Sequence, residues 1–406
     1  MKSLNRLIEL LVGGLFIFSG LIKCNDPVGT QIKLKEYFEV FAADFASFFD
    51  VFIPYALPIA IFIVVLEVAL GVALIAGFKK RLTLHALLAL ILFFTFLTFY
   101  TAYFNKVTDC GCFGDAIKLT PWQSFYKDVI LLVMIFFLWV QGKRISNKAG
   151  LLSFSITALG TGAALYVALA AVAHLPFLDF RPYNVGNDIA EQMQPQEPCK
   201  TEYVVLRDGK EIRSTEWRDD FMKKVPQVKE VTEEVTRWDE AAQDSVTEAV
   251  TRMDTTMKSV KNYDSLYTLI LNEEACTPVI QDYGLYSPEG EDYTQASLEG
   301  NDLILVVHNL RKTDRESFDE IKRFMEVLAS EPTLKRAVFT SEAPDSFEAF
   351  RHEVQLDVPF YLGDEKMLKT MIRSNPGLIL LSDGVVKGKW HHNDIPSPDV
   401  IREMIR

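Results

Sequence analysis

Cysteine is the residue type in this sequence whose spacing most plainly allows chemistry. Five cysteines occur among the 406 residues, and two of them, Cys110 and Cys112, stand one residue apart in the segment Asp109-Cys110-Gly111-Cys112-Phe113-Gly114. A disulfide between them would close a very small, strained ring, and strain raises the reduction potential of a disulfide. The pair is therefore a candidate for thiol–disulfide exchange, with a static loop staple as the alternative.

The remaining cysteines allow other roles. Cys24 ends the first apolar segment and is predicted to lie at the depth of the Cys110–Cys112 loop, which makes it a candidate resolving thiol. The alternative is that Cys24 is a small apolar residue. Cys199 and Cys276 are predicted to form a structural disulfide, with exchange against the loop pair as the alternative. Two thiolates without a histidine or a third cysteine nearby make a poor zinc site, so no metal is predicted.

Three charged residues are predicted to lie within or next to the membrane. Glu67 falls in the middle of an apolar segment, where an unpaired carboxylate costs about 3 kcal/mol, so it should face the interior of a helical bundle. There it is a candidate proton relay or cofactor headgroup ligand. Its structural alternative is a hydrogen bond between helices, to Thr95, Thr98 or Tyr100. Lys23 ends the first apolar segment and Asp128 lies near the outer end of the fourth. We expect these two residues to form an ion pair.

Five apolar segments are long enough to place these residues in a membrane, because a spanning helix needs about 20 residues. They cover residues 4–22, 52–78, 82–104, 122–140 and 151–175. Basic residues gather before the first, between the second and third, and between the fourth and fifth, and such residues mark the cytoplasmic side. The chain is thus predicted to lie in the bilayer of a bacterial inner membrane, with its N-terminus in the cytoplasm. All five cysteines and the C-terminal region are then periplasmic. Residues 30–50 are predicted to form a helix on the outer interface.

Charge divides the chain into two parts. Residues 1–150 carry a net charge of +4 and the remainder a net charge of −16. A strongly acidic exterior argues against nucleic-acid binding, which needs a basic surface. An exported or periplasmic protein is the predicted partner. The sequence predicts no particular oligomeric state.

The segment from Phe18 to Gly29 and the Cys-Gly-Cys-Phe-Gly loop resemble the DoxX-like membrane proteins, and the loop resembles in particular the branch that contains the methylamine-utilisation protein MauE. Residues 176–183 resemble the segment that joins such a bundle to an external domain in Bacteroidetes-type members. The resemblance implies a four-helix core built from the first four spans. It also implies a relationship to vitamin K epoxide reductase-like thiol oxidases, which use a C-x-x-C pair and a quinone. Because the pair here is C-x-C, a quinone is implied by analogy alone and no cofactor is predicted.

The external region begins with a predicted hairpin over 203–213. A long amphipathic helix is then predicted over 228–260, because its apolar residues recur at spacings of three and four. From about residue 279, strands and helices alternate in an order similar to the thioredoxin fold, and Asn375-Pro376 matches the position of that fold's cis-proline. The active-site cysteines of such a domain should follow the strand 303–308. The sequence from Asn309 to Asp314 contains none.

The predicted fold class is an α-helical membrane bundle followed by an α/β thioredoxin-like domain. Residues 1–145 form the four-helix domain, 146–178 a fifth transmembrane helix, 179–275 an external linker region and 276–406 the thioredoxin-like domain. The predicted function is thiol–disulfide exchange or maturation of exported proteins, with Cys110 and Cys112 as the redox pair. The alternative is a non-enzymatic membrane scaffold whose thioredoxin-like domain only binds.

Overall fold

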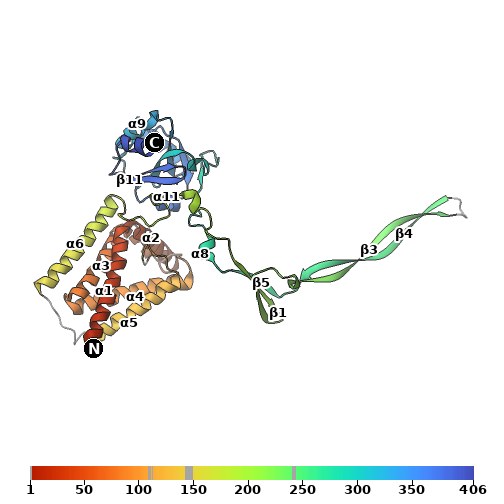
Figure 1. Cartoon of the computed structure of the whole chain (residues 1–406), viewed down its shortest axis with the longest axis horizontal. Helices are drawn as coiled ribbons and strands as arrows, with labels where there is room; N and C mark the ends of the chain where they lie inside the picture. The colour runs from red at the N-terminus through yellow and green to blue at the C-terminus, as the bar shows by residue number, and fades with distance from the viewer. Residues whose placement is uncertain (1, 108–110, 112, 142–149, 240–243) are drawn as a thin grey trace. The chain divides into compact units, whose positions relative to one another are not determined.

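The computed structural model describes residues 2–107, 111, 113–141, 150–239 and 244–406. The chain forms two compact units, one made of residues 1–192 with 280–406 and the other of residues 193–279. The first unit contains a helical bundle and an α/β domain. The second unit consists mainly of antiparallel strands. Each unit is described by itself below (Figure 1).

Apolar helices make up the bundle. They are α1 (Lys2–Asn25), α2 (Pro27–Asp44), the 3-10 helix η1 (Ser47–Tyr55), α3 (Ala56–Ala76), α4 (Lys80–Phe104), α5 (Pro121–Val140) and α6 (Leu151–Ala173). Within the described residues, five helical stretches are long and apolar enough to cross a membrane, and they include α1, α3, α4, α5 and α6. This confirms the five segments predicted from the sequence. The helix predicted over 30–50 is confirmed as far as Asp44 in α2, whose Leu34, Tyr37 and Phe41 are buried, whereas residues 47–50 begin η1.

Small residues let α1 and α3 approach each other closely. A Cβ atom added at Gly71 of α3 would lie 2.7 Å from the carbonyl oxygen of Gly13 in α1, so the two backbones meet there. Such close contact is typical of helix packing in membranes, where dispersion replaces the hydrophobic effect. Helix α6 packs against α3, and α4 packs against α5. We call the end of the bundle where α1, α4 and α6 terminate the outer rim, after its predicted orientation.

The α/β domain is built on a six-stranded sheet with the strand order β11-β10-β7-β8-β9-β6. Its strands are β6 (Leu285–Tyr286), β7 (Asn301–Val307), β8 (Leu334–Thr340), β9 (Phe360–Gly363), β10 (Gly377–Ser382) and β11 (Val385–His391). Its helices are α9 (Phe318–Val327), α10 (Pro344–Glu353), α11 (Glu365–Met371) and α12 (Pro398–Met404). Strand β7 is parallel to β8 and antiparallel to β10, which in turn is antiparallel to β11. With the cis peptide bond between Asn375 and Pro376, this is the predicted thioredoxin fold.

The central strand of this domain is an apolar run, as expected for a strand covered on both faces. Residues Leu303 to Val307 are fully buried. Helices α9, α10 and α12 contribute Phe318, Phe347 and Ile401 to the core on one face. At the other edge of the sheet the short strand β6 pairs with β9.

The second unit corrects the predicted long helix. Residues 222–239 and 244–261 form an antiparallel ribbon in which β3 (Met222–Asp239) pairs along its whole length with β4 (Asp244–Lys261). Valine and threonine recur throughout both strands, and β-branched residues favour strands over helices. The remaining strands of this unit form a three-stranded sheet. They are β1 (Thr201–Arg207), β2 (Lys210–Ser214) and β5 (Ser265–Ile270), and β1–β2 is the predicted hairpin. The short helix α8 (Glu273–Cys276) belongs to this unit, whereas the short helix α7 (Ile189–Gln192) belongs to the first.

Candidate functional site

Cys110 and Cys112 lie outside the described residues, but the loop around them can be followed. Gly111, between them, has a φ of +61°, and Gly114 has a φ of +53°. Glycine adopts this left-handed conformation without steric strain, whereas other residues rarely do. In the described part of this connection the chain turns at these two glycines, and α5 begins at the Thr120 capping box. The two glycines thus supply the turn that a C-x-C motif needs.

Two lysines lie beside this loop. A Cβ atom on Gly111 would be 3.5 Å from Cγ of Lys33, which belongs to α2. The Lys127 ammonium of α5 lies 5.2 Å from the centre of the Phe113 ring. Both are partnered by carboxylates, Lys33 by Glu36 at 3.1 Å and Lys127 by Asp128 at 2.6 Å. Cations near a thiol favour the reactive thiolate form.

Cys24 does not present its thiol to this loop. Its side chain is fully buried and packs in a cluster with Val64 and Val68 of α3 and Ala164 and Ala168 of α6. A resolving thiol must be reached by another sulfur, and this cluster gives no access. The geometry therefore favours a role for Cys24 as a small apolar packing residue over a role as a resolving thiol.

The predicted partners of Glu67 and Lys23 are wrong, because these two residues bind each other. The Lys23 ammonium lies 2.7 Å and 3.0 Å from the two oxygens of Glu67, and the Ser19 hydroxyl donates to the same carboxylate at 3.2 Å. Helices α1 and α3 pack too closely for α4 to intervene, since a Cβ atom on Gly20 would lie 3.2 Å from Cβ of Glu67. The result is a buried ion pair that joins the first two spans of the bundle.

Asp128 is paired within its own neighbourhood rather than with Lys23. It accepts hydrogen bonds from Lys127 at 2.6 Å and from Thr98 of α4 at 3.1 Å. A further buried carboxylate was not predicted: Glu9, at the opposite end of α1, pairs with Lys80 at 2.7 Å and Arg6 at 3.0 Å. The Thr98–Asp128 contact joins α4 to α5 and the Lys80–Glu9 pair joins α4 to α1, so each carboxylate helps to hold two helices together.

The thioredoxin-like domain has polar side chains where its cysteines would be expected. The backbone N–H of Asp314 donates to the carbonyl oxygen of Asn375, next to the cis-proline, at 3.0 Å. His392 lies 3.0 Å from the Ser374 hydroxyl and 3.7 Å from the Asp314 carboxylate. Burial lowers the pKa of nearby His308 to about 4. None of these described groups is a thiol.

Sequence reasoning missed Arg373, three residues before the cis-proline. Its guanidinium bonds Asp26 of the bundle at 3.0 Å and 3.2 Å and lies 3.4 Å from Asp115, which follows the Cys110–Cys112 loop. The Arg373 side chain is 7% exposed. No pattern in the sequence relates these residues, which are separated by up to 347 positions.

The segment that follows α6 is bound to the α/β domain. The carboxylate of Asp179 binds Arg181 at 2.7 Å and Lys389 of β11 at 2.6 Å, and Arg181 also donates to the Thr370 carbonyl. Burial and then the positive charge of Arg181 lower the pKa of Lys389 to about 7, although Asp179 opposes the shift. This segment includes the joining motif identified in the sequence.

Cys199 and Cys276 are joined by a disulfide, with their Cα atoms 4.8 Å apart, in agreement with the predicted pairing. The disulfide lies within the second unit and closes the base of its three-stranded sheet. It takes both residues out of any exchange that requires free thiols.

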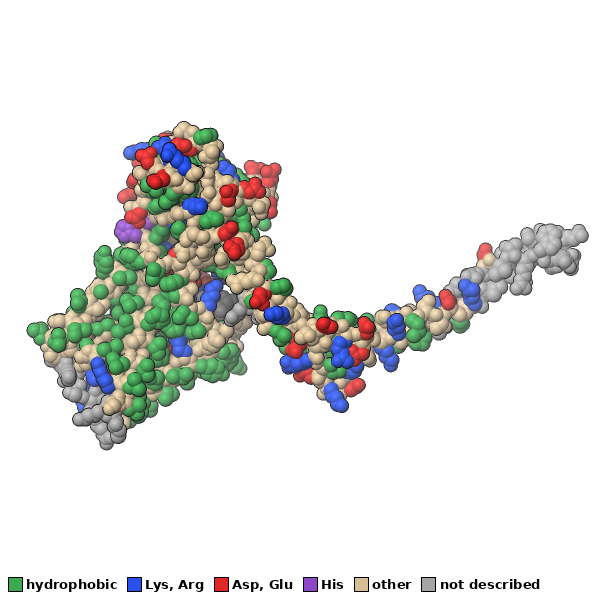
Figure 2. All heavy atoms as spheres, in the orientation of Figure 1, with side chains coloured by type: hydrophobic (Ala, Val, Ile, Leu, Met, Phe, Trp, Pro, Cys, Tyr) green, Lys and Arg blue, Asp and Glu red, His purple; other side chains and the backbone are tan. Residues whose placement is uncertain are grey.

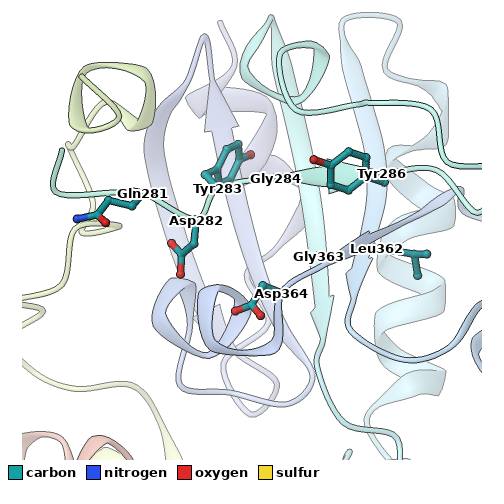
Figure 3. A pocket seen from close by; sticks show the side chains of 8 residues that line it. All are labelled: Gln281, Asp282, Tyr283, Gly284, Tyr286, Leu362, Gly363 and Asp364. Atoms are coloured by element: carbon teal, nitrogen blue, oxygen red, sulfur yellow. The ribbon is translucent and has the colours of Figure 1, made fainter. Parts of the chain in front are cut away.

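One cavity of the described residues, of about 440 Å³, lies at the edge of the thioredoxin-like sheet where β6 meets β9. Figure 3 shows that Asp282 and Asp364 project from neighbouring segments of its lining. Asp364 is occupied as the cap of α11, where it accepts from the backbone of Lys366 and Met367. The cavity thus adds no candidate nucleophile or redox group.

Residues 1–141 match the family model described as methylamine utilisation protein MauE. This part of the chain is similar to the MauE family. The match covers α1 to α5 together with the Cys110–Cys112 loop, and the α/β domain follows it. No curated protein sequence matches the chain.

Several solved structures resemble the α/β domain. StoA from Bacillus subtilis shares 14% identity over 30% of this chain and 96% of its own, with a TM-score of 0.25. A secreted Mycobacterium tuberculosis disulfide oxidoreductase homologous to E. coli DsbE shares 13% identity over 30% of this chain and 94% of its own, also with a TM-score of 0.25. A thiol peroxidase from Chromobacterium violaceum shares 22% identity over 31% and 83%, with a TM-score of 0.24.

Proposed function

We propose that this chain is a membrane thiol–disulfide exchange protein in which Cys110 and Cys112 form the exchanging pair. The observation that supports this most is the loop itself. Gly111, which separates the two cysteines in the sequence, and Gly114 both have a left-handed φ, and the described part of the loop lies beside Lys33 and Lys127 in the region similar to MauE. A short, strained disulfide in such a position suits exchange better than structural support.

The proposed reaction is a two-step thiol–disulfide exchange. A thiolate of an exported protein attacks one sulfur of the Cys110–Cys112 disulfide, and the other sulfur leaves as a thiolate that takes up a proton. The second thiol of the exported protein then attacks the mixed disulfide, which forms the new disulfide and leaves the loop pair reduced. Two electrons pass from the exported protein to the pair. The disulfide of a second exchange protein returns the pair to its oxidised state by the same steps.

The orientation belongs to this proposal. With the predicted cytoplasmic N-terminus, the loop and the thioredoxin-like domain lie on the periplasmic face of the inner membrane, where disulfides persist. The intramembrane pair Lys23–Glu67 and the buried Cys24 take no part in the exchange, because both are engaged in helix packing.

The test uses the full chain in detergent with a reduced peptide that carries two cysteines. We expect the oxidised chain to convert the peptide to its disulfide and to become reduced in equal amount. Cys110→Ser/Cys112→Ser should abolish the conversion. The matched controls, Cys24→Ser and Cys199→Ser/Cys276→Ser, should retain it. Conversion that persists at the original rate without Cys110 and Cys112 would refute the assignment of the pair.

A further inference from the structure

We propose that the outer rim of the bundle is the ligand of the cis-proline loop in the thioredoxin-like domain, with Arg373 as the anchoring side chain. The cis-proline loop is defined here as residues 373–376. In this role the loop binds another part of its own chain, and an external polypeptide cannot occupy it at the same time. The inference rests on ion pairs and packing, and does not depend on the redox role of Cys110 and Cys112.

The charge arrangement at Arg373 is that of a buried anchor. One guanidinium meets two carboxylates, those of Asp26 and Asp115, and donates in addition to the Lys369 carbonyl at 2.6 Å. The Arg373 side chain is 7% exposed and that of Asp26 is 19% exposed. A desolvated charge is tolerated when it is paired and hydrogen-bonded, and the planar guanidinium suits two partners at once.

The surface of the rim is shaped for this contact. Gly29 lies in the first turn of α2, whose N-cap is Asp26. A Cβ atom there would come within 2.5 Å of the Asp26 carboxylate and 3.2 Å of the Arg373 guanidinium. A larger residue at position 29 would therefore crowd the ends of both charged side chains, and at least one of them would have to shift.

The polar groups of the cis-proline loop are also engaged. The carbonyl oxygen of Asn375 accepts from the Asp314 N–H at 3.0 Å, and its side chain accepts from His308 and donates to the Asn309 carbonyl. The Ser374 side chain and Pro376 are buried. These bonds hold the loop against the segment from His308 to Asp314 of its own domain.

One further contact at the same rim holds the segment that precedes the domain, and another holds the domain itself. Asn25, at the end of α1, exchanges hydrogen bonds with the backbone of Leu178 at 2.6 Å and 2.9 Å. His174, at the end of α6, binds the Asp394 carboxylate at 2.8 Å. The Arg373 contact is therefore one of several, and the Cys-free thioredoxin-like domain is a docking module for the bundle that carries the Cys110–Cys112 loop.

The test is hydrogen–deuterium exchange on the full chain in detergent. The variants are Arg373→Gln, Asp26→Asn and their double. Asparagine keeps the N-cap of α2 and removes the charge. We expect each single substitution to speed amide exchange in residues 26–34 and 372–377 roughly tenfold, and the double to exchange no faster than the faster single, as for two residues in one ion-pair network. The matched control is Arg315→Gln, because Arg315 pairs with Glu353 within the domain and is 53% exposed. It should leave both segments unchanged.

A further variant alters the bundle side of the same contact. Gly29→Val should produce the same local increase while protection in β7 and β8 stays at the wild-type level, which shows that the domain remains folded. Wild-type exchange in Arg373→Gln and Gly29→Val would overturn the proposal. So would a double variant whose effect equals the product of the two single effects.

Discussion

The buried pair of Lys23 and Glu67 offers a sharp test of how the bundle is held together. The Lys23 and Glu67 side chains are 10% and 2% exposed, and the ammonium contacts both carboxylate oxygens. Lys23→Met leaves the carboxylate with the Ser19 hydroxyl as its described partner. Removing one member of a buried pair in a soluble protein costs about 3–5 kcal/mol. Polar contacts between membrane helices contribute less, about 0.6 to 1.7 kcal/mol, because the unfolded state in the bilayer also finds partners.

We therefore expect Lys23→Met to lower the free energy of unfolding by about 2–3 kcal/mol, between these two ranges. Lys23→Met/Glu67→Gln removes both charges and should lose only about 1 kcal/mol, the net contribution of a typical hydrogen bond. The assay is denaturant unfolding of the full chain in mixed micelles, followed by tryptophan fluorescence. Lys35→Met is the control, since Lys35 and Glu39 form an exposed pair in α2 that contributes about 0.5 kcal/mol or less. A double variant as unstable as the sum of Lys23→Met and Glu67→Gln would refute the pairing.

Three further predictions follow from the packing, the disulfide and the titration of the chain. Gly71→Ala should destabilise the bundle by about 1–3 kcal/mol in the same unfolding assay, because the new Cβ meets backbone at 2.7 Å, whereas Gly14→Ala meets nothing within 4 Å and should be neutral. Reduction of Cys199–Cys276 releases a closed loop with a sequence separation of 77 and removes about 4 kcal/mol of constraint, so limited proteolysis should accelerate within 200–275 and not in the bundle. Burial, followed by the charge of a neighbouring histidine, lowers the pKa of His391 to about 4. The unfolded chain therefore binds the extra proton first, and stability should fall by up to about 1.4 kcal/mol per pH unit from pH 6.5 to 4. His391→Asn should flatten that slope in unfolding measured across this range.

The elements that the sequence predicted well are those whose pattern is long and local. Each of the five spans carries its own apolar run, and the strands of the thioredoxin-like domain are short apolar segments separated by amphipathic helices. Pro376 was placed correctly because the order of elements around it is that of a known fold. The disulfide of Cys199 and Cys276 was predicted from their positions on either side of one segment.

The ribbon β3–β4 is a segment for which the spacing of apolar residues predicted the wrong secondary structure. Valines spaced by three and four residues between Val228 and Val260 suit one face of a helix, yet the segment pairs as two strands. The β-branched composition was the signal that competes with the spacing, and here it prevails. For this segment the strand propensity of its residues was thus more informative than the spacing of its apolar residues.

The ion-pair partners of the charged residues could be found only from the three-dimensional structure. Lys23 was assigned to Asp128 because both lie at the outer end of the bundle, but the close approach of α1 and α3 at Gly20 brings Lys23 to Glu67 instead. Arg373 and Asp26 belong to different domains, and no spacing rule connects them. Only the docking of the thioredoxin-like domain on the outer rim makes them neighbours.

The redox state of the loop pair tests the central claim most directly. The full chain in detergent is equilibrated with mixtures of reduced and oxidised glutathione, the free thiols are alkylated, and Cys110 and Cys112 are quantified by mass spectrometry. The account predicts that the two thiols appear and disappear together, at a potential above about −300 mV, the range below which structural disulfides fall. Cys24, buried among apolar side chains, should remain a thiol throughout. A Cys110–Cys112 pair that stays reduced in the most oxidising mixture, or a disulfide that persists in the most reducing one, would contradict the account.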